Sequence, residues 1–158
     1  MRSMLIPLGT VLCAGLTSCA NSILQGYDGP VLPDDETYLV RAARNTSDRL
    51  SANIEIISYD SPRGDVIPVS TRSVRMVPGD SCFGVVATSS TMDQATAELC
   101  FYGEAGEEYE IRVLVSGIPQ NMEDTTGART TAYRGPFSVD SIWIVNSNTA
   151  DMMALSTF

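Results

Sequence analysis

The sequence predicts an all-β protein, an antiparallel β-sandwich of about seven strands. Short alternating runs rich in β-branched residues recur between clusters of Gly, Pro, Asn and Asp. Beyond the N-terminal 18 residues, no segment sustains a helical period. With 44% hydrophobic and 18% charged residues, the chain is too apolar to be disordered throughout. Its 158 residues allow one ordinary domain and a short additional segment.

The expected strands follow one another with turn-forming residues between them. Within each strand, alternate apolar residues are expected to face the core, and Trp143 should be at least partly buried. The predicted strands are 37–43, 51–59, 72–77, 81–87, 97–102, 109–115 and 141–145. The residues expected to face inward are Ile54, Ile56, Val74, Met76, Tyr109, Ile111, Val113 and Val115.

Residues 1–18 have the pattern of a secretory signal peptide. Arg2 precedes an apolar run from Met4 to Leu16, and small residues follow. That run is shorter than the roughly 20 residues that a membrane-spanning helix needs. We therefore expect a signal-peptide helix at 1–18.

The end of this segment, Leu16-Thr17-Ser18-Cys19, resembles the lipobox of bacterial lipoproteins. The resemblance implies that the Cys19 thiol receives a diacylglyceryl group and that a peptidase cuts before it. Two or three acyl chains would then hold the protein to a bilayer almost permanently. Because Ala20 and not Asp follows the cysteine, the resemblance implies an outer-membrane lipoprotein facing the periplasm. The alternative is an ordinary secreted protein cleaved near Ala14 or Ala20, with Cys19 incidental.

The remaining organisation follows from this boundary. Residues 19–35 contain two Gly and two Pro with little periodicity, which predicts a lipidated cysteine followed by a flexible or extended tether. Residues 36–158 are then the β-sandwich domain. Two short pieces, 77–80 (VPGD) and 106–109 (GEEY), resemble small β-sandwich modules of envelope lipoproteins, with Greek-key or transthyretin-like connections. In such modules the tyrosine, here Tyr109, bonds back to the preceding turn.

Cys82 and Cys100 are expected to form a disulfide. Cys13 would leave with the signal peptide and Cys19 would be lipidated, so these two remain in an oxidising compartment. A hairpin that sets them opposite each other also pairs Phe83 with Leu99, with both sulfurs on the other face. Such a bridge contributes about 3 kcal/mol. The competing interpretation, a redox or metal-binding thiol pair, lacks CxxC spacing and a His ligand.

Composition excludes several functions. The net charge is −9, there is no His, and all ten basic residues are Arg, without a basic patch. Nucleic-acid binding, His-dependent nucleophilic catalysis and most zinc sites are therefore not expected. An acidic cluster around a turn matches no EF-hand spacing and is interpreted as solvated. We expect no catalytic residues, no cofactor and no metal site, and so no enzyme. The cluster comprises Glu104, Glu107, Glu108 and Glu110.

The polar stretch 117–136 is the longest without a predicted strand. It is either a true loop or a hairpin whose second strand lies around 128–133. Arg129, Tyr133 and Arg134 make it the candidate binding loop. Two functions remain in view: a non-catalytic, lipid-anchored structural or adaptor module with an envelope protein partner, or a lipoprotein that binds a glycan, a metal or a small envelope molecule.

Overall fold

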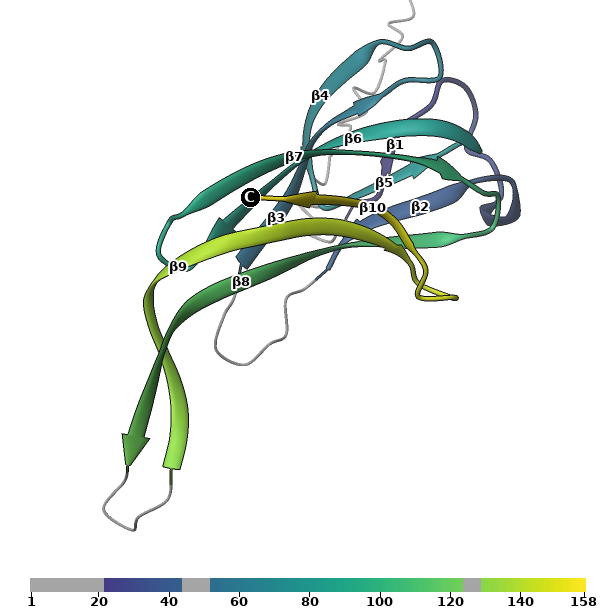
Figure 1. The fold of residues 1–158 in the computed structure, drawn as a ribbon. Helices are drawn as coiled ribbons and strands as arrows, with labels where there is room; N and C mark the ends of the chain where they lie inside the picture. Colours follow the sequence, from purple (N-terminus) through teal and green to yellow (C-terminus); the bar gives the residue numbers. More distant parts are fainter. Residues whose placement is uncertain (1–21, 44–51, 124–128) are drawn as a thin grey trace, which may run out of the picture.

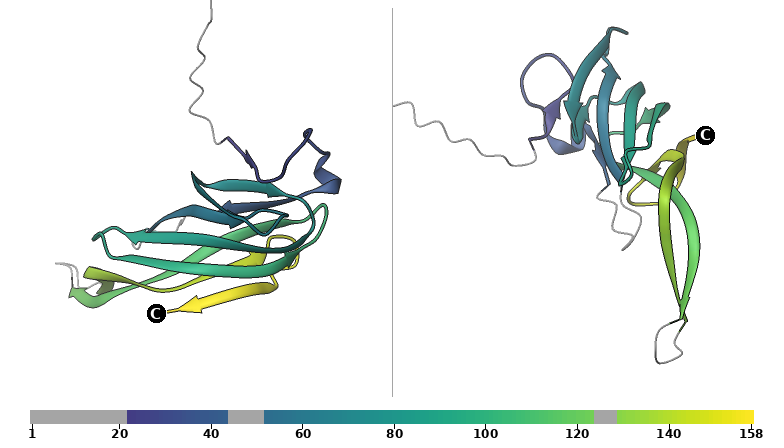
Figure 2. Two further views of the ribbon diagram at one scale, coloured as in Figure 1. Left: turned by 90° about the horizontal axis from the view of Figure 1, so that it is seen from above. Right: turned by 90° about the vertical axis from the view of Figure 1, so that its left-hand side faces the viewer.

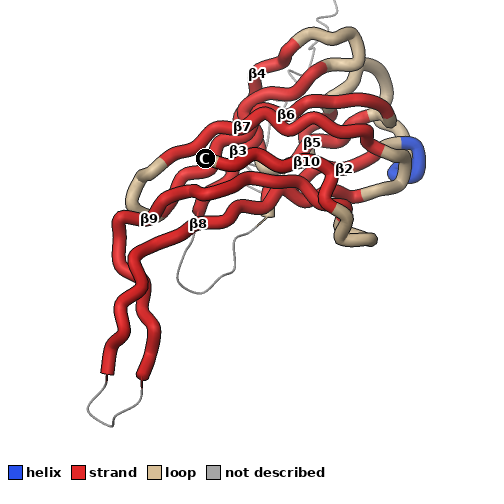
Figure 3. The backbone as a smooth tube through the Cα atoms, viewed as in Figure 1, coloured by secondary structure: helices blue, strands red, loops and turns tan. Residues whose placement is uncertain are grey.

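The computed structural model describes residues 22–43, 52–123 and 129–158. The expected signal peptide at 1–18 and the lipobox Cys19 lie outside these ranges. Within them the chain is almost entirely β, with a single 3-10 turn at Asp34–Glu36 (Figures 1 and 3). No helix in this part of the chain is long and apolar enough for a membrane span. The strands are β1 (Leu24–Gln25), β2 (Tyr38–Ala42), β3 (Ala52–Asp60), β4 (Val66–Thr71), β5 (Ser73–Met76), β6 (Gly79–Ser89), β7 (Gln94–Gly103), β8 (Glu108–Glu123), β9 (Arg129–Asn146) and β10 (Met152–Thr157).

The strands form two sheets packed face to face, so the predicted β-sandwich is confirmed (Figure 2). One sheet has the order β1-β5-β2-β8-β9-β10 and the other the order β4-β3-β6-β7. The first sheet is mixed, because β2 pairs in parallel with β8 and β1 in parallel with β5. Parallel neighbours need a long connection. The chain provides one here, since β3 to β7 intervene between β2 and β8.

The core lies between the sheets and is built by the predicted alternation. Ile54, Ile56, Val74 and Ile111 have no exposed surface, and Tyr109 and Met76 are almost as completely buried. Val113 is partly buried, as is Trp143, which matches the expectation for the single tryptophan. On β9, Ile142 and Ile144 meet Val113 and Ile111 across the ladder. Burial of these alternate side chains accounts for the agreement between pattern and structure.

Three strands were not predicted, and all of them are sheet edges. β4 is half-exposed along its length and contains Pro68, which weakens the strand pattern. Pro68 lies opposite Ser58 at a register shift, where a missing N–H is tolerated. β10 and the two-residue β1 are the edges of the larger sheet. No residue of β4 or β10 is fully buried, so burial imposes little alternation on these two strands. The edge strand β7, whose alternate residues are buried, was predicted.

The segment predicted as a tether differs from that expectation over its described part, 22–35. β1 pairs with β5, and Gly26 and Tyr27 are buried. A Cβ at Gly26 would lie 2.2 Å from the Met76 sulfur, so only glycine fits this approach. The Tyr27 hydroxyl accepts the Leu32 N–H at 3.0 Å and closes the following loop. Residues 22–35 therefore lie against the sandwich instead of extending away from it.

Candidate functional site

The β8–β9 hairpin is the feature that departs most from a closed sandwich. β8 pairs with β2 only over Leu39–Ala42 and Glu108–Ile111, and β9 pairs with β10 only up to Ser141. Beyond these positions, among the described residues, the two strands pair only with each other, out to Glu123 and Arg129. Figure 1 shows this part leaving the body as a two-stranded ribbon. We call residues 118–123 and 129–136 the arm.

The arm resolves the alternative left open for 117–136 in favour of a hairpin. All three residues of the candidate binding loop lie in β9. Arg134 lies opposite Ile118, Tyr133 opposite Pro119, and Arg129 opposite Glu123. They therefore lie on one strand of the arm, Arg129 at its outer end and Tyr133 and Arg134 nearer its base, and not in a loop at the rim of the sandwich.

The turn between β6 and β7 holds the base of the arm. The Thr91 hydroxyl donates to the Phe137 carbonyl at 3.1 Å, and the Phe137 N–H donates to the Thr91 Oγ1 at 3.0 Å. The Ser89 hydroxyl donates to the same carbonyl at 3.0 Å, and the Val139 N–H donates to Asp93 Oδ2 at 3.1 Å. These bonds satisfy β9 backbone groups where the strand leaves the sandwich, so they set the direction in which the arm departs.

A second set of polar contacts lies at the same base, on the β8 side. The Ser116 hydroxyl is 3.0 Å from the Ser138 hydroxyl and donates to Asp140 Oδ1 at 2.9 Å. Register shifts occur between Leu114 and Val115 and again between Ser116 and Ile118. Such bulges bend a strand pair and increase its twist. The arm is thus directed by bulges and by side-chain hydrogen bonds at its base.

Sequence reasoning missed this base. The predicted strands 81–87 and 97–102 leave a polar run between them, but β6 and β7 extend into it and leave only a short turn at 90–93. Met92 takes a positive φ of 68° in that turn. The Ser, Thr and Asp content signals a turn. Contacts with residues some 46 positions away leave no trace in that pattern.

Cys82 and Cys100 form the predicted disulfide. They lie directly opposite each other in the β6–β7 ladder, with a Cα–Cα distance of 4.0 Å. Phe83 faces Leu99, as the hairpin register required. The bridge lies on the outer face, beside Glu98. The three side chains are close enough together to suggest a metal site, but a disulfide offers no thiolate ligands.

The acidic cluster does not converge on one point. Glu108 pairs with Arg41 at 3.2 Å and Glu110 with Arg112 at 2.6 Å. Glu107 accepts hydrogen bonds from the side-chain amides of Asn146 and Asn148 at 2.9 and 2.8 Å, and these bonds lower its pKa. Each of these three carboxylates therefore has its own partner, as in a solvated surface turn.

Tyr109 makes the contact expected from the resemblance to small sandwich modules. Its hydroxyl accepts the Glu104 N–H at 3.0 Å, back in the preceding turn. Beside it, the buried Tyr38 hydroxyl donates to Ser81 Oγ at 2.7 Å. Burial raises the pKa of Tyr38 to about 12. The Tyr38 ring lies against Gly103, where any Cβ would come within 2.3 Å of it. Both hydroxyls are therefore satisfied structural groups.

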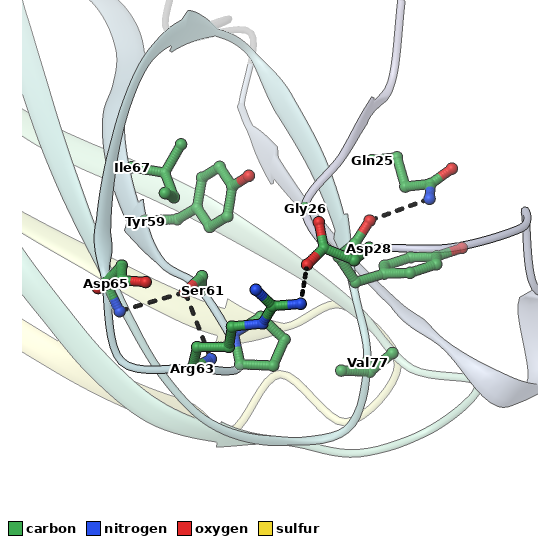
Figure 4. A pocket seen from close by; sticks show the side chains of 11 residues that line it. Gln25, Gly26, Asp28, Tyr59, Ser61, Arg63, Asp65, Ile67 and Val77 are labelled. Atoms are coloured by element: carbon green, nitrogen blue, oxygen red, sulfur yellow. Dashed lines mark hydrogen bonds and ion pairs between the residues drawn. The ribbon is translucent and has the colours of Figure 1, made fainter.

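A cleft of about 620 Å³ lies where the N-terminal segment meets the β3–β4 turn (Figure 4). Arg63 reaches across it to Asp28, at 3.0 Å. The Gln25 amide donates to the carbonyls of Tyr27 and Gly29, and Ser61 Oγ accepts the Arg63 and Asp65 N–H groups. These polar groups of the cleft thus hydrogen-bond or ion-pair with one another and with the backbone. They do not converge on an open position, as polar groups do in ligand-binding pockets.

Comparison with known proteins identifies no relative. No family model matches the chain, and neither a curated protein nor a solved structure matches it significantly. The functional argument therefore depends on this chain's own residues.

Proposed function

We propose that this chain is a non-catalytic, lipid-anchored module of the bacterial cell envelope. In this proposal Cys19 carries the lipid, the outer membrane holds the protein on its periplasmic side, and the sandwich presents the arm to an envelope protein. The lipobox resemblance supports the anchor, and the disulfide is consistent with an oxidising compartment.

The observation that carries the adaptor role is the arm. An isolated two-stranded hairpin is marginally stable in water, and its outer edges offer unpaired backbone groups to another strand. The chain nevertheless holds the base of this hairpin with hydrogen bonds from Ser89, Thr91 and Asp93. A ribbon that is fixed at its base and has no third strand from the described part of the chain is suited to pairing with a partner chain. The cleft, with its internally satisfied polar groups, supports the ligand-binding alternative less well.

Photo-crosslinking in intact cells tests the role of the arm. A photoreactive phenylalanine analogue replaces Tyr133 in the arm or, as the matched control, the exposed Tyr102 on β7. We expect one discrete crosslinked envelope protein from position 133 and none from position 102. Equal crosslinking at both positions, or none at either, would contradict the adaptor role.

Two further variants test separately whether the arm contacts the partner and whether the direction of the arm matters for that contact. The first replaces residues 118–134 with Asn-Gly, which forms a tight hairpin turn and retains Phe137 and its bonds. It should fold like the parent and lose the partner. The second, Thr91→Ala, removes both bonds of Thr91 to Phe137 and should weaken crosslinking from position 133. Thr96→Ala, at an exposed position on β7, is its control.

Metabolic labelling with radioactive palmitate tests the anchor separately. Label should enter the parent protein and be lost in Cys19→Ser, and the mature N-terminus should be a modified Cys19 by mass spectrometry. An unmodified Cys19, or cleavage near Ala14 or Ala20, would favour the secreted alternative. Because this assay does not involve the arm, failure of one half of the proposal leaves the other half testable.

A further inference from the structure

The outer edge of β10 has backbone groups without a partner in the described part of the chain. Phe158 N–H donates to the Asp140 carbonyl at 3.0 Å, which directs the backbone groups of residue 158 toward β9. In an antiparallel ladder this orientation alternates, so the N–H and C=O groups of Leu155 and Thr157 point away from β9. No backbone bond reaches them from any residue that the structure describes.

This edge lacks three of the protections that free edges ordinarily carry, namely charged residues, proline and short length. The run 152–158 (MMALSTF) has no charged side chain and no proline. Met152, Leu155 and Phe158 are each more than half exposed. A register shift interrupts the strand between Met152 and Ala154, but 154–157 is regular. By contrast, the β4 edge contains Pro68, the β1 edge is two residues long, and the β7 edge carries the charged Glu98.

We propose that β10 is a self-association interface, in which the β10 strands of two copies pair antiparallel and join their six-stranded sheets into one. A symmetric register exists in which Leu155 of one copy lies opposite Leu155 of the other. The outward N–H and C=O groups of both copies then face each other. Ala154 lies opposite Ser156 in this register, and both residues belong to the inner face, so the alternation of the sheet is preserved.

The position of β10 favours a second copy over a membrane surface. The chain as a whole has a net charge of −9, which opposes association between copies, but the run 152–158 has no charged side chain to add to that repulsion. β1 and β10 are opposite edges of the same sheet, and the described chain begins beside β1 (Figure 2). A lipid anchor at Cys19, on which this step rests and which belongs to the proposed function, therefore precedes the edge opposite β10. This inference concerns an edge distinct from the arm and does not depend on the adaptor role.

Cysteine crosslinking of the full-length protein tests the pairing. Leu155→Cys places a thiol at the two-fold axis, and Leu114→Cys is its matched control, because both leucines are 53% exposed on the same sheet. Leu114 lies on β8, separated from the edge by β9. On a non-reducing denaturing gel, mild oxidation should convert Leu155→Cys into a disulfide-linked dimer of twice the mass, and leave Leu114→Cys and the parent without a covalent dimer.

A second measurement covers the case in which crosslinking fails for chemical reasons. Leu155→Lys brings two like charges together at the axis, so light scattering of the purified protein should show loss of the dimer, whereas Leu114→Lys should retain it. Thermal melting checks that both exposed substitutions leave the fold intact. A parent protein that is monomeric at every concentration would overturn the proposal. So would a Leu155→Cys thiol that crosslinks no better than Leu114→Cys, or that captures a different protein in place of itself.

Discussion

β8 and β9 belong to two different environments along their length. In the body, β8 lies between β2 and β9, and β9 lies between β8 and β10. Ile111, Ile142 and Ile144 have no exposed surface there. In the arm the same two strands continue their ladder, and no other strand that the structure describes pairs with them there. The backbone pairing is alike in both halves, and only the neighbours differ.

This difference indicates which half is stable without help. A hydrogen-bonded pair of strands gains little in water, because its backbone groups exchange one partner for another. The body half also removes apolar surface from water, which is the larger favourable contribution. We therefore attribute the stability of the hairpin to its body half and regard the arm as the part available to a partner.

Hydrogen exchange should separate the two halves by the largest margin. Amides of Ile111 and Ile144 should open only with global unfolding, which costs about 5–15 kcal/mol in ordinary domains. Amides between 118 and 123 should open at close to no cost. The measurement is native-state exchange followed by mass spectrometry or NMR. Equal protection in both halves of the free protein would refute the comparison, and protection of the arm on partner binding would extend it.

A pair of substitutions on β8 tests the claim that burial causes the difference. Ile111→Ala removes fully buried methyl groups and should lower the free energy of unfolding by about 2–5 kcal/mol. Leu114→Ala, three residues along the same strand but 53% exposed, should cost less than about 0.5 kcal/mol. Urea denaturation provides both values. A similar loss for the two variants would show that burial does not govern this strand.

The same contrast explains what could be predicted from the sequence. Body strands were found because burial imposes alternation, as at Ile54 and Ile56, and the cysteine hairpin was found because its register also paired Phe83 with Leu99. β4 and β10 were missed because none of their residues is fully buried, whereas the edge strand β7 was predicted because its alternate residues are buried. For the segment 117–136, which contains the arm, the sequence left two alternatives open, a loop or a hairpin. The base of the arm depends on contacts such as Thr91 with Phe137, which no local pattern reveals.

After burial in the core, the disulfide should make the next largest contribution to the free energy of unfolding. Cys82 and Cys100 are 18 residues apart, so the bridge should stabilise the protein by about 3 kcal/mol through its effect on the unfolded chain. The double variant Cys82→Ser, Cys100→Ser should show this loss in urea. Treating the parent with a reductant should produce the same change and leave the variant unaffected. Hydrogen exchange in the arm should not change on reduction, since the bridge joins β6 to β7. A change in arm exchange on reduction would indicate that the body transmits strain to it.

A further loss of stability is predicted at alkaline pH, and it originates in the body. Burial raises the pKa of Tyr38 to about 12 in the folded protein, against 10.0 for an ordinary tyrosine. Above pH 10 the unfolded chain therefore releases this proton while the folded one keeps it, so stability is full below pH 10 and falls as the pH rises toward 12. The loss should be on the order of 2 kcal/mol. Burial also raises the pKa of Tyr59 and Tyr109, which adds to the loss in the same direction.

Tyr38→Phe isolates the contribution of that one hydroxyl. At neutral pH it leaves the buried Ser81 hydroxyl without its partner and should cost about 1–2 kcal/mol. Between pH 10 and pH 12 the variant should lose less stability than the parent, because it lacks the proton that the unfolded parent releases. Tyr102→Phe, at an exposed position on β7, is the control for removing a hydroxyl and should retain the alkaline loss of the parent. Urea midpoints measured across this pH range provide the comparison. Parallel profiles for the parent and Tyr38→Phe would mean that the alkaline sensitivity does not come from the tyrosine at the centre of the core.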